Sequence, residues 1–170
     1  MTRQQFIELV SAAQESLRRF LRGLCSGDGS RADDIAQEAL LKAYLSFERF
    51  EGRARFSTWL FRIAYNCFYD HMRRQEKEVT ADNAKSDVPD LRRLHSLPDD
   101  SSSADRRFEH QHLYQAIGAL GKKEQAVILL FYMEEKSIKE IAVITDMSSG
   151  AVRAHLFRGR KHLKQYLKEL

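Results

Sequence analysis

Both prolines of this chain fall in one acidic strip, with helical periodicity on either side of it. Pro89 and Pro98 lie in residues 78–105, together with a DDSSS stretch. Proline removes a backbone donor, and a strip this poor in apolar residues has little to bury. We therefore predict a flexible linker here, which divides the chain into residues 1–77 and 106–170 as two small domains that tumble semi-independently.

Apolar residues on both sides of the strip recur with the 3, 4 and 7 spacing of amphipathic helices. In the N-terminal part this spacing predicts helices over residues 6–24, 31–48 and 57–74, with Ser30 as the expected N-cap of the second. In the C-terminal part it predicts helices that include residues 108–120, 122–133, 137–145 and 148–167. No run alternates as a β-strand would. The predicted fold class is all-α, with two small helical domains joined by a flexible acidic linker.

Charge is distributed in blocks along the chain. Residues 1–77 hold 13 Lys/Arg against 10 Asp/Glu, residues 78–105 hold 3 against 7, and residues 106–170 hold 12 against 7. The net charges are therefore +3, −4 and +5. Two basic blocks around an acidic strip predict two contact surfaces for a polyanion.

The two cysteines, Cys25 and Cys67, are far apart and lack metal-site spacing, so we predict free thiols in a reducing compartment. No apolar run approaches the length of a membrane span, and the N-terminus does not resemble a signal peptide. We expect a cytoplasmic protein without cofactor, metal site or membrane insertion.

The segment at 137–163 has the pattern of a helix-turn-helix, and its second helix carries no acid. Val152 and Leu156 share the face expected to be buried, with Ser148 or Ser149 as the N-cap. Arg153 and Arg158 lie on the opposite face, where guanidinium groups can reach base edges or phosphates. The alternative is an ordinary solvated basic helix, although such helices usually mix both charge signs.

The helix predicted at 57–74 has a second face of a different kind. Aromatic residues alternate there with arginine and asparagine, which suits stacking on unpaired bases and pairing with phosphates. The members of this face are Thr58, Arg62, Tyr65, Asn66, Tyr69 and Arg73, and the preceding loop adds Phe50, Arg53 and Arg55. The alternative is that Tyr65 and Tyr69 pack against a neighbouring helix.

The helix predicted at 31–48 places two leucines among polar residues on its outer face. The members of this face are Asp34, Gln37, Glu38, Leu41 and Leu45. Exposed leucines beside acids are typical of a protein-binding surface, and single exposed leucines are also common on ordinary surfaces.

Two long segments resemble one known family. RADDIAQEALLKAYLSFERFEGRARFSTWLFRIAYNCFYDHMRR (31–74) resembles conserved region 2 of bacterial sigma factors of the extracytoplasmic function (ECF) group. LGKKEQAVILLFYMEEKSIKEIAVITDMSSGAVRAHLFRGRKHL (120–163) resembles their region 4. The resemblance implies a protein that binds core RNA polymerase, reads the −35 and −10 promoter elements and helps to open the duplex. It implies no catalytic residue, because the chemistry belongs to the polymerase.

The resemblance also assigns partners and sites. The implied partners are core polymerase, through its β′ clamp helices and β flap, promoter DNA, and an anti-sigma factor. The implied polymerase-binding residues are Asp34, Gln37, Glu38, Leu41 and Leu45. The implied −10 residues are Phe50, Glu51, Gly52, Arg53, Arg55, Phe56, Ser57, Arg62, Ile63, Tyr65, Asn66, Tyr69 and Arg73. The implied −35 residues are Ser148, Ser149, Gly150, Arg153, Ala154, Phe157, Arg158 and Lys161.

This chain departs from the family pattern in its last helix. Ala151, Ala154 and His155 stand where threonine, serine and arginine are usual, and Gly159 stands where alanine is usual. The lost hydroxyl and guanidinium donors should change phosphate contacts or the −35 preference.

Two other classes of protein share single features. A response-regulator output domain can carry the same helix-turn-helix, but residues 1–77 lack the strands of a receiver domain. A metalloenzyme could use EHQH at 109–112, but histidines two apart on a helix point to different sides.

Overall fold

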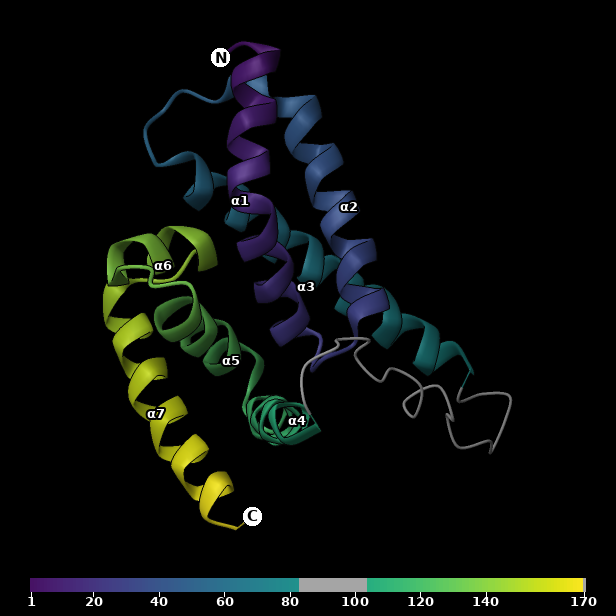
Figure 1. Ribbon diagram of the computed structural model, residues 1–170, viewed down its shortest axis with the longest axis vertical. Helices are drawn as coiled ribbons and strands as arrows, with labels where there is room; N and C mark the ends of the chain where they lie inside the picture. The colour runs from purple at the N-terminus through teal and green to yellow at the C-terminus, as the bar shows by residue number, and fades with distance from the viewer. Residues whose placement is uncertain (83–103, 170) are drawn as a thin grey trace.

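The computed structural model describes residues 1–82 and 104–169. Every regular element in these ranges is a helix, which confirms the all-α prediction (Figure 1). The N-terminal domain contains α1 (Arg3–Leu24), α2 (Gly29–Ser46), the short 3-10 helix η1 (Phe47–Arg49) and α3 (Phe56–Asp82). The C-terminal domain contains α4 (Ala104–Gly118), α5 (Lys122–Ile128), the π-helical turn η3 (Leu129–Met133), α6 (Ile138–Thr145) and α7 (Ser149–Lys168). None of these helices combines the length and the hydropathy that crossing a membrane requires.

Side-chain caps determine where the helices begin. At α1, Thr2 and Gln5 form a reciprocal capping box, and Ser137 and Glu140 do the same at α6. The predicted cap at Ser30 is wrong. Asp28 caps α2 instead by accepting the Arg31 backbone N–H at 3.1 Å, so α2 begins two residues earlier than expected.

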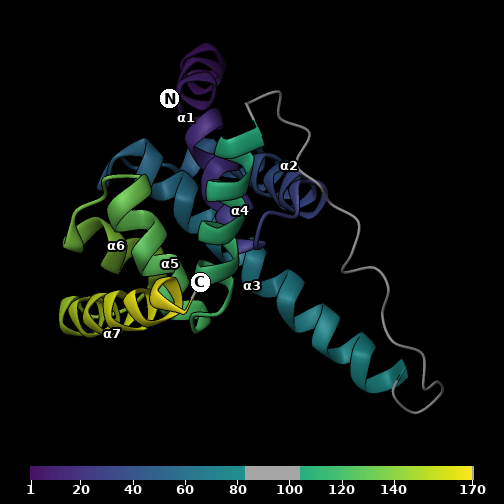
Figure 2. The ribbon, with the colours of Figure 1, turned by 60° about the horizontal axis from the view of Figure 1, so that its bottom comes forward.

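The third helix continues past its predicted end near residue 74. In Figure 2, α3 projects away from the bundle toward Asp82. Residues 75–82 are polar and contain neither glycine nor proline, so nothing in them stops the helix. The start of the predicted linker is therefore helical. The middle of the linker lies outside the described residues.

The two domains share a continuous hydrophobic core. Buried side chains of α1 and α3, such as Phe20 and Phe61, belong to the same cluster as Leu129 and Ile141 of the C-terminal domain. Helix α1 contacts α4, α5 and η3, and α6 packs on α3. The expectation that the domains lie free of each other is therefore wrong for this structure, because apolar surface of each domain is buried against the other.

The predicted free thiols are confirmed, since Cys25 and Cys67 are both buried and unpaired. Burial raises the pKa of the Cys25 thiol to about 12, so this thiol stays protonated and unreactive at neutral pH.

Candidate nucleic-acid and protein interfaces

Helix α7 presents the basic face that its sequence predicts. Ser148 caps the helix by accepting the Ala151 N–H at 3.1 Å, while Val152 and Leu156 are buried beneath it. The exposed residues of the predicted −35 set are Ser148, Gly150, Arg153, Ala154, Phe157, Arg158 and Lys161, and Ser149 is half-buried. Phe157 is 70% exposed, which is unusual for an aromatic ring on a face that only meets water. The face therefore offers cations, an apolar ring and small residues to a partner.

The two arginines expected to reach DNA have different surroundings. Within the described residues, Arg153 makes no ion pair, so its guanidinium donors are available. The Arg158 Nε lies 4.0 Å from the Glu124 carboxylate of α5, and its Nη2 lies 3.3 Å from the His155 ring. The same carboxylate is 2.9 Å from the His162 ring. Glu124 thus lies beside Arg158 and His162, a neighbour that the sequence analysis missed because no helical spacing links α5 to α7.

Close packing explains why α7 has Gly159 at a position where the family usually has alanine. A Cβ at Gly159 would lie 2.8 Å from Cγ1 of Ile128 and 3.2 Å from its Cδ1. Since real Cβ atoms do not approach that closely, Ile128 of α5 fills the volume that a methyl group would need.

We expect Gly159→Ala to destabilise the protein by about 1 kcal/mol. Overpacking costs roughly 1–3 kcal/mol, and the better helix propensity of alanine offsets about 1 kcal/mol of it. Gly150→Ala in the same helix is the matched control, because a Cβ there meets nothing within 4 Å. Urea unfolding should show the first variant less stable than wild type and the second equally or more stable. Equal effects of the two variants would contradict the packing explanation.

The predicted −10 face divides into an exposed part and a buried part. The exposed members are Glu51, Gly52, Arg53, Arg55, Arg62, Asn66 and Arg73, and the half-buried members are Phe50, Ser57, Ile63 and Tyr69. Gly52 has a φ of 71°, a left-handed conformation that glycine adopts without strain. The exposed members keep cations and an amide available on one side of α3 and its preceding loop.

The prediction that Thr58 and Tyr65 lie on an exposed face is wrong for this structure, because they are 2% and 5% exposed. Phe56, which the resemblance places in the −10 set, is also buried, at 8% exposed. Phe56 joins an aromatic cluster, with ring centroids 5.8 Å from Phe6 and 5.5 Å from Trp59. Tyr65 packs in the shared core, as the alternative interpretation allowed. The helical period places Thr58 and Tyr65 on one arc, but it carries no information about the C-terminal domain that packs on this helix.

Two arginines of the predicted −10 face form ion pairs with acidic residues close to them in the sequence. Arg53 pairs with Glu51 in the loop at 2.7 Å, and Arg73 pairs with Asp70 one turn earlier at 3.6 Å. Contacts of this exposed kind are weak and leave the side chains free to exchange partners.

The outer face of α2 exposes two leucines among polar residues, as predicted. Leu41 and Leu45 are 58% and 74% exposed, and Asp34 and Gln37 are exposed beside them. Exposed leucines of this kind occur both on protein-binding surfaces and on ordinary surfaces, so both interpretations of the face stand.

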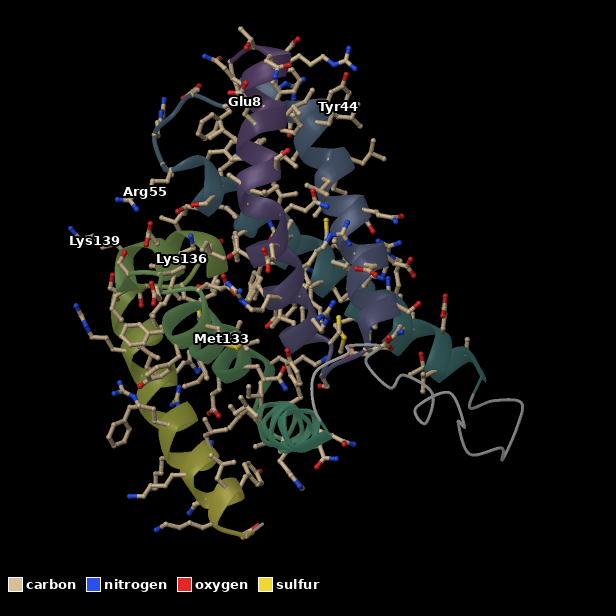
Figure 3. The ribbon with its side chains drawn as sticks, in the orientation of Figure 1. Glu8, Tyr44, Arg55, Met133, Lys136 and Lys139 are labelled. Carbon is tan, nitrogen blue, oxygen red and sulfur yellow. The ribbon has the colours of Figure 1, made fainter. Side chains whose placement is uncertain are left out.

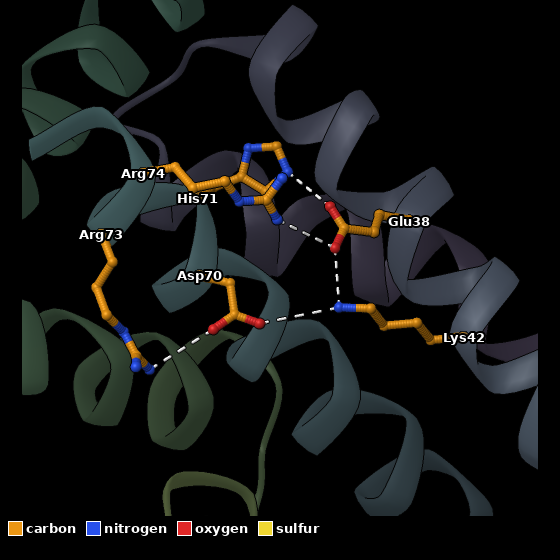
Figure 4. A network of polar contacts seen from close by, with 6 residues as sticks. All are labelled: Glu38, Lys42, Asp70, His71, Arg73 and Arg74. Carbon is orange, nitrogen blue, oxygen red and sulfur yellow. Dashed lines mark hydrogen bonds and ion pairs between the residues drawn. The ribbon is translucent and has the colours of Figure 1, made fainter. Parts of the chain in front are cut away.

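Glu38 differs from its neighbours because it is only a quarter exposed and is held in a network (Figure 4). Its carboxylate lies 2.8 Å from Lys42 Nζ, 2.8 Å from the His71 ring and 3.4 Å from Arg74 Nη2. Two of these partners belong to α3, so Glu38 joins α2 to α3. The sequence analysis expected Glu38 on the outer face, and in the structure its carboxylate is turned to partners on α2 and α3.

The network predicts acid sensitivity. The Lys42 ammonium, followed by His71, lowers the pKa of Glu38 from 4.5 to about 2, although partial burial opposes this. Because the folded-state pKa lies below the unfolded value, the stabilisation is complete above about pH 4.5 and is lost as the pH falls toward 2. After allowance for solvent screening we expect about 1 kcal/mol.

The test compares free energies of unfolding between pH 7 and pH 3. Glu38→Gln should be less stable than wild type at pH 7, and the difference should shrink as the pH falls. The matched control is Glu48→Gln, at an exposed carboxylate with no ion pair in the described part of the chain. A Glu38→Gln deficit that is constant with pH would show that the ion pairs do not contribute.

Two family models match this chain. Sigma-70 region 2 matches residues 9–78, and Sigma-70, region 4 matches residues 110–163. The first model covers α2 and most of α1 and α3, and the second covers the helix-turn-helix with α5 and most of α4.

The sequences of individual relatives align with most or nearly all of this chain. The chain is 32% identical over 148 residues to the ECF RNA polymerase sigma factor SigW of Bacillus subtilis, covering 85% of this chain and 79% of that protein. It is 31% identical to the ECF RNA polymerase sigma-E factor of Haemophilus influenzae, covering 99% and 90%.

A solved structure extends the likeness to the placement of the domains. The sigma factor RpoE of Bartonella quintana, solved in complex with the anti-sigma factor NepR, has a TM-score of 0.81 and 25% identity. The match covers 97% of this chain and 98% of that one, so both domains superimpose together. The chain belongs to the sigma-70 family of RNA polymerase sigma factors, in the extracytoplasmic function group that serves transcription initiation.

Proposed function

We propose that this protein binds core RNA polymerase, recognises the −35 and −10 elements of a promoter and promotes melting of the DNA. In this proposal residues 1–77 act as region 2 and residues 106–170 as region 4. The observation that carries it is the exposed α7 face, where Arg153, Phe157 and Lys161 stand clear of any acid on the same helix. A major groove admits a helix of this kind, and small residues let its backbone approach.

The −35 element is read in duplex form by α7. Arg153 and Arg158 donate to guanine edges or phosphates, and Phe157 contacts thymine methyl groups or sugars. Ser148 and Ser149, at the positive end of the helix dipole, position a phosphate, while Gly150 and Ala154 leave room for the backbone. Lys161 adds a phosphate contact.

The 50–57 loop and the exposed side of α3 bind the −10 element as a single strand. Asn66 offers an amide to base edges, and Arg62 and Arg73 offer cations to phosphates. Phe50, with its ring half-buried against Trp59 at 5.2 Å, is placed to stack on a base at the edge of the cluster. Tyr65 and Phe56 serve this surface from beneath, as packing residues.

Core polymerase docks on α2. Leu41 and Leu45 provide the apolar contact for the β′ clamp helices, with Asp34 and Gln37 at the rim. Region 4 approaches the β flap. The protein needs no catalytic residue of its own, and an anti-sigma factor is its proposed inhibitor, as NepR is the partner in the RpoE structure.

Transcription with purified core polymerase tests this function. Core enzyme with this protein should start transcription at discrete sites of genomic DNA, and the mapped starts should share sequence near −10 and −35. Starts that are equally scattered with and without the protein would contradict the proposal.

A further inference from the structure

The proposed −35 surface has a histidine at its edge to which the proposed function gives no role. His155 is half-buried on α7, one residue after Ala154 and three before Arg158. At 100° per residue it falls between the buried side of the helix and the exposed face, which carries Arg153 and Phe157. When a helix lies in a major groove, such an edge meets the phosphates along the groove wall.

The neighbouring helix α5 completes this edge. In Figure 3, side chains of α7 extend away from the other helices on one side, and α5 lies along the opposite side of α7. The Glu124 carboxylate of α5 lies 2.9 Å from the His162 ring and 4.0 Å from Arg158 Nε. Lys123, the residue before Glu124, is exposed. His155 therefore lies among two permanent cations, one carboxylate and a second histidine.

The hydrogen bond between His155 and Arg158 exists only while the imidazole is neutral. Arg158 Nη2 lies 3.3 Å from His155 Nδ1. A guanidinium can only donate, so Nδ1 is the acceptor, and the neutral ring carries its proton on Nε2. A protonated ring has an N–H on both nitrogens and cannot accept from Arg158. Protonation of His155 therefore frees one arm of Arg158 and adds a second cation beside it.

The surroundings keep His155 neutral in the free protein. Burial lowers the pKa of His155 from its ordinary value of 6.5, the positive charges of Arg158 and Lys123 lower it further, and Glu124 opposes them. Helices α4 and α6 also pack on α7, and their described residues add no charge that shifts this pKa. The ring is therefore mostly neutral at pH 7 and above.

A DNA phosphate at this edge reverses the balance. Without it, the charges of Arg158 and Lys123 repel an imidazolium. A phosphate brings a negative charge and acceptor oxygens to the same place, and an opposite charge within about 4–6 Å favours the charged form of a titratable group. The pKa of His155 therefore rises when DNA binds, and the imidazolium and the freed guanidinium can both donate to the phosphate.

From this arrangement we propose that His155 is a further phosphate-binding residue of the −35 surface, which contacts the DNA backbone as an imidazolium and couples −35 binding to the uptake of a proton. The proposal rests on the proposed function, because α7 must enter duplex DNA. The pKa of His155 is higher in the complex than in the free protein. Affinity should therefore rise as the pH falls through the higher pKa, and the gain should be complete below the lower one.

The experiment measures the affinity of holoenzymes for duplex −35 DNA at about pH 8 and about pH 5.5. The pKa of Glu38, about 2, lies below this range, so its network stays intact. His155→Gln cannot be charged, and its affinities report every other group that titrates. Wild type should gain about fivefold more affinity on acidification than His155→Gln, the value of one exposed ion pair of favourable geometry. Its log–log dependence on salt should also steepen by about 0.9, as expected for one more phosphate contact.

Two further variants identify the group that takes up the proton. His155→Arg is permanently charged, so at both pH values it should bind about as tightly as wild type does at the lower pH. The matched control is His162→Gln, which removes a histidine of the same helix that pairs with Glu124. This control should keep the gain of wild type.

The proposal is overturned if wild type and His155→Gln gain the same affinity as the pH falls, or if His162→Gln rather than His155→Gln loses the gain. A random-sequence duplex of equal length keeps the proposed function separate, because its backbone carries the same phosphates. If no holoenzyme prefers the promoter duplex over the random one, the proposed function fails. The comparison of wild type with His155→Gln on the random duplex then decides the proposal about His155.

Discussion

Leu41→Arg is expected to weaken binding to core RNA polymerase by about 30-fold or more. A central apolar side chain of an interface commonly contributes about 2 kcal/mol or more, and an arginine in its pocket adds an unpaired charge. Leu41 is 58% exposed, so the substitution should leave the free energy of unfolding within about 0.5 kcal/mol of wild type. Titration of labelled protein with core enzyme measures the affinity, and urea unfolding checks the fold.

The matched control is Val79→Arg, on α3 beyond the bundle, where the valine is 55% exposed. It makes a similar change in exposed apolar surface and charge outside the α2 face. Equal losses for the two variants would indicate a general charge effect, and unchanged binding by Leu41→Arg would remove α2 from the interface.

The sequence predicted those parts of the fold that depend on local pattern. Helical spacing located α1, α2, α3 and α7, and it separated Val152 and Leu156, which are buried, from Arg153 and Phe157, which are exposed. A single helix face is enough to make that distinction, because burial repeats with the helical period.

Apart from the cap at Ser30 and the end of α3, the errors lie where two distant segments meet. Thr58 and Tyr65 were placed on an open face, and both are buried, Tyr65 in the core shared by the two domains. The contacts of Glu134 with Arg19 and of Lys136 with Ser57 went unnoticed, since nothing in the sequence links a turn at 134–137 to α1 or α3. These contacts join residues 79 and 115 positions apart and depend on tertiary packing, which periodicity does not encode.

Arg153→Ala and Asn66→Ala are expected to damage different DNA contacts of the holoenzyme. Loss of a bidentate arginine–guanine pair costs about 1–3 kcal/mol, or about 5- to 150-fold in affinity for duplex −35 DNA. Loss of the Asn66 amide should cost about 1 kcal/mol, or about fivefold, in affinity for the single-stranded −10 segment. Both side chains are exposed, so neither change should affect folding.

The central claim is that region 4 reads duplex DNA while region 2 holds a melted strand. It is tested most directly by the affinity of wild-type and variant holoenzymes for two probes, a duplex −35 segment and a single-stranded −10 segment of a promoter found by start-site mapping. Two variants serve as controls. Arg160→Ala removes an arginine whose Nε donates to the Leu156 carbonyl of the same helix, and Gln75→Ala changes an exposed residue on the far part of α3. The account predicts that Arg153→Ala loses only the duplex probe, Asn66→Ala loses only the single strand, and the controls lose neither. Loss of the same probe by both variants, or of neither probe by either, would contradict it.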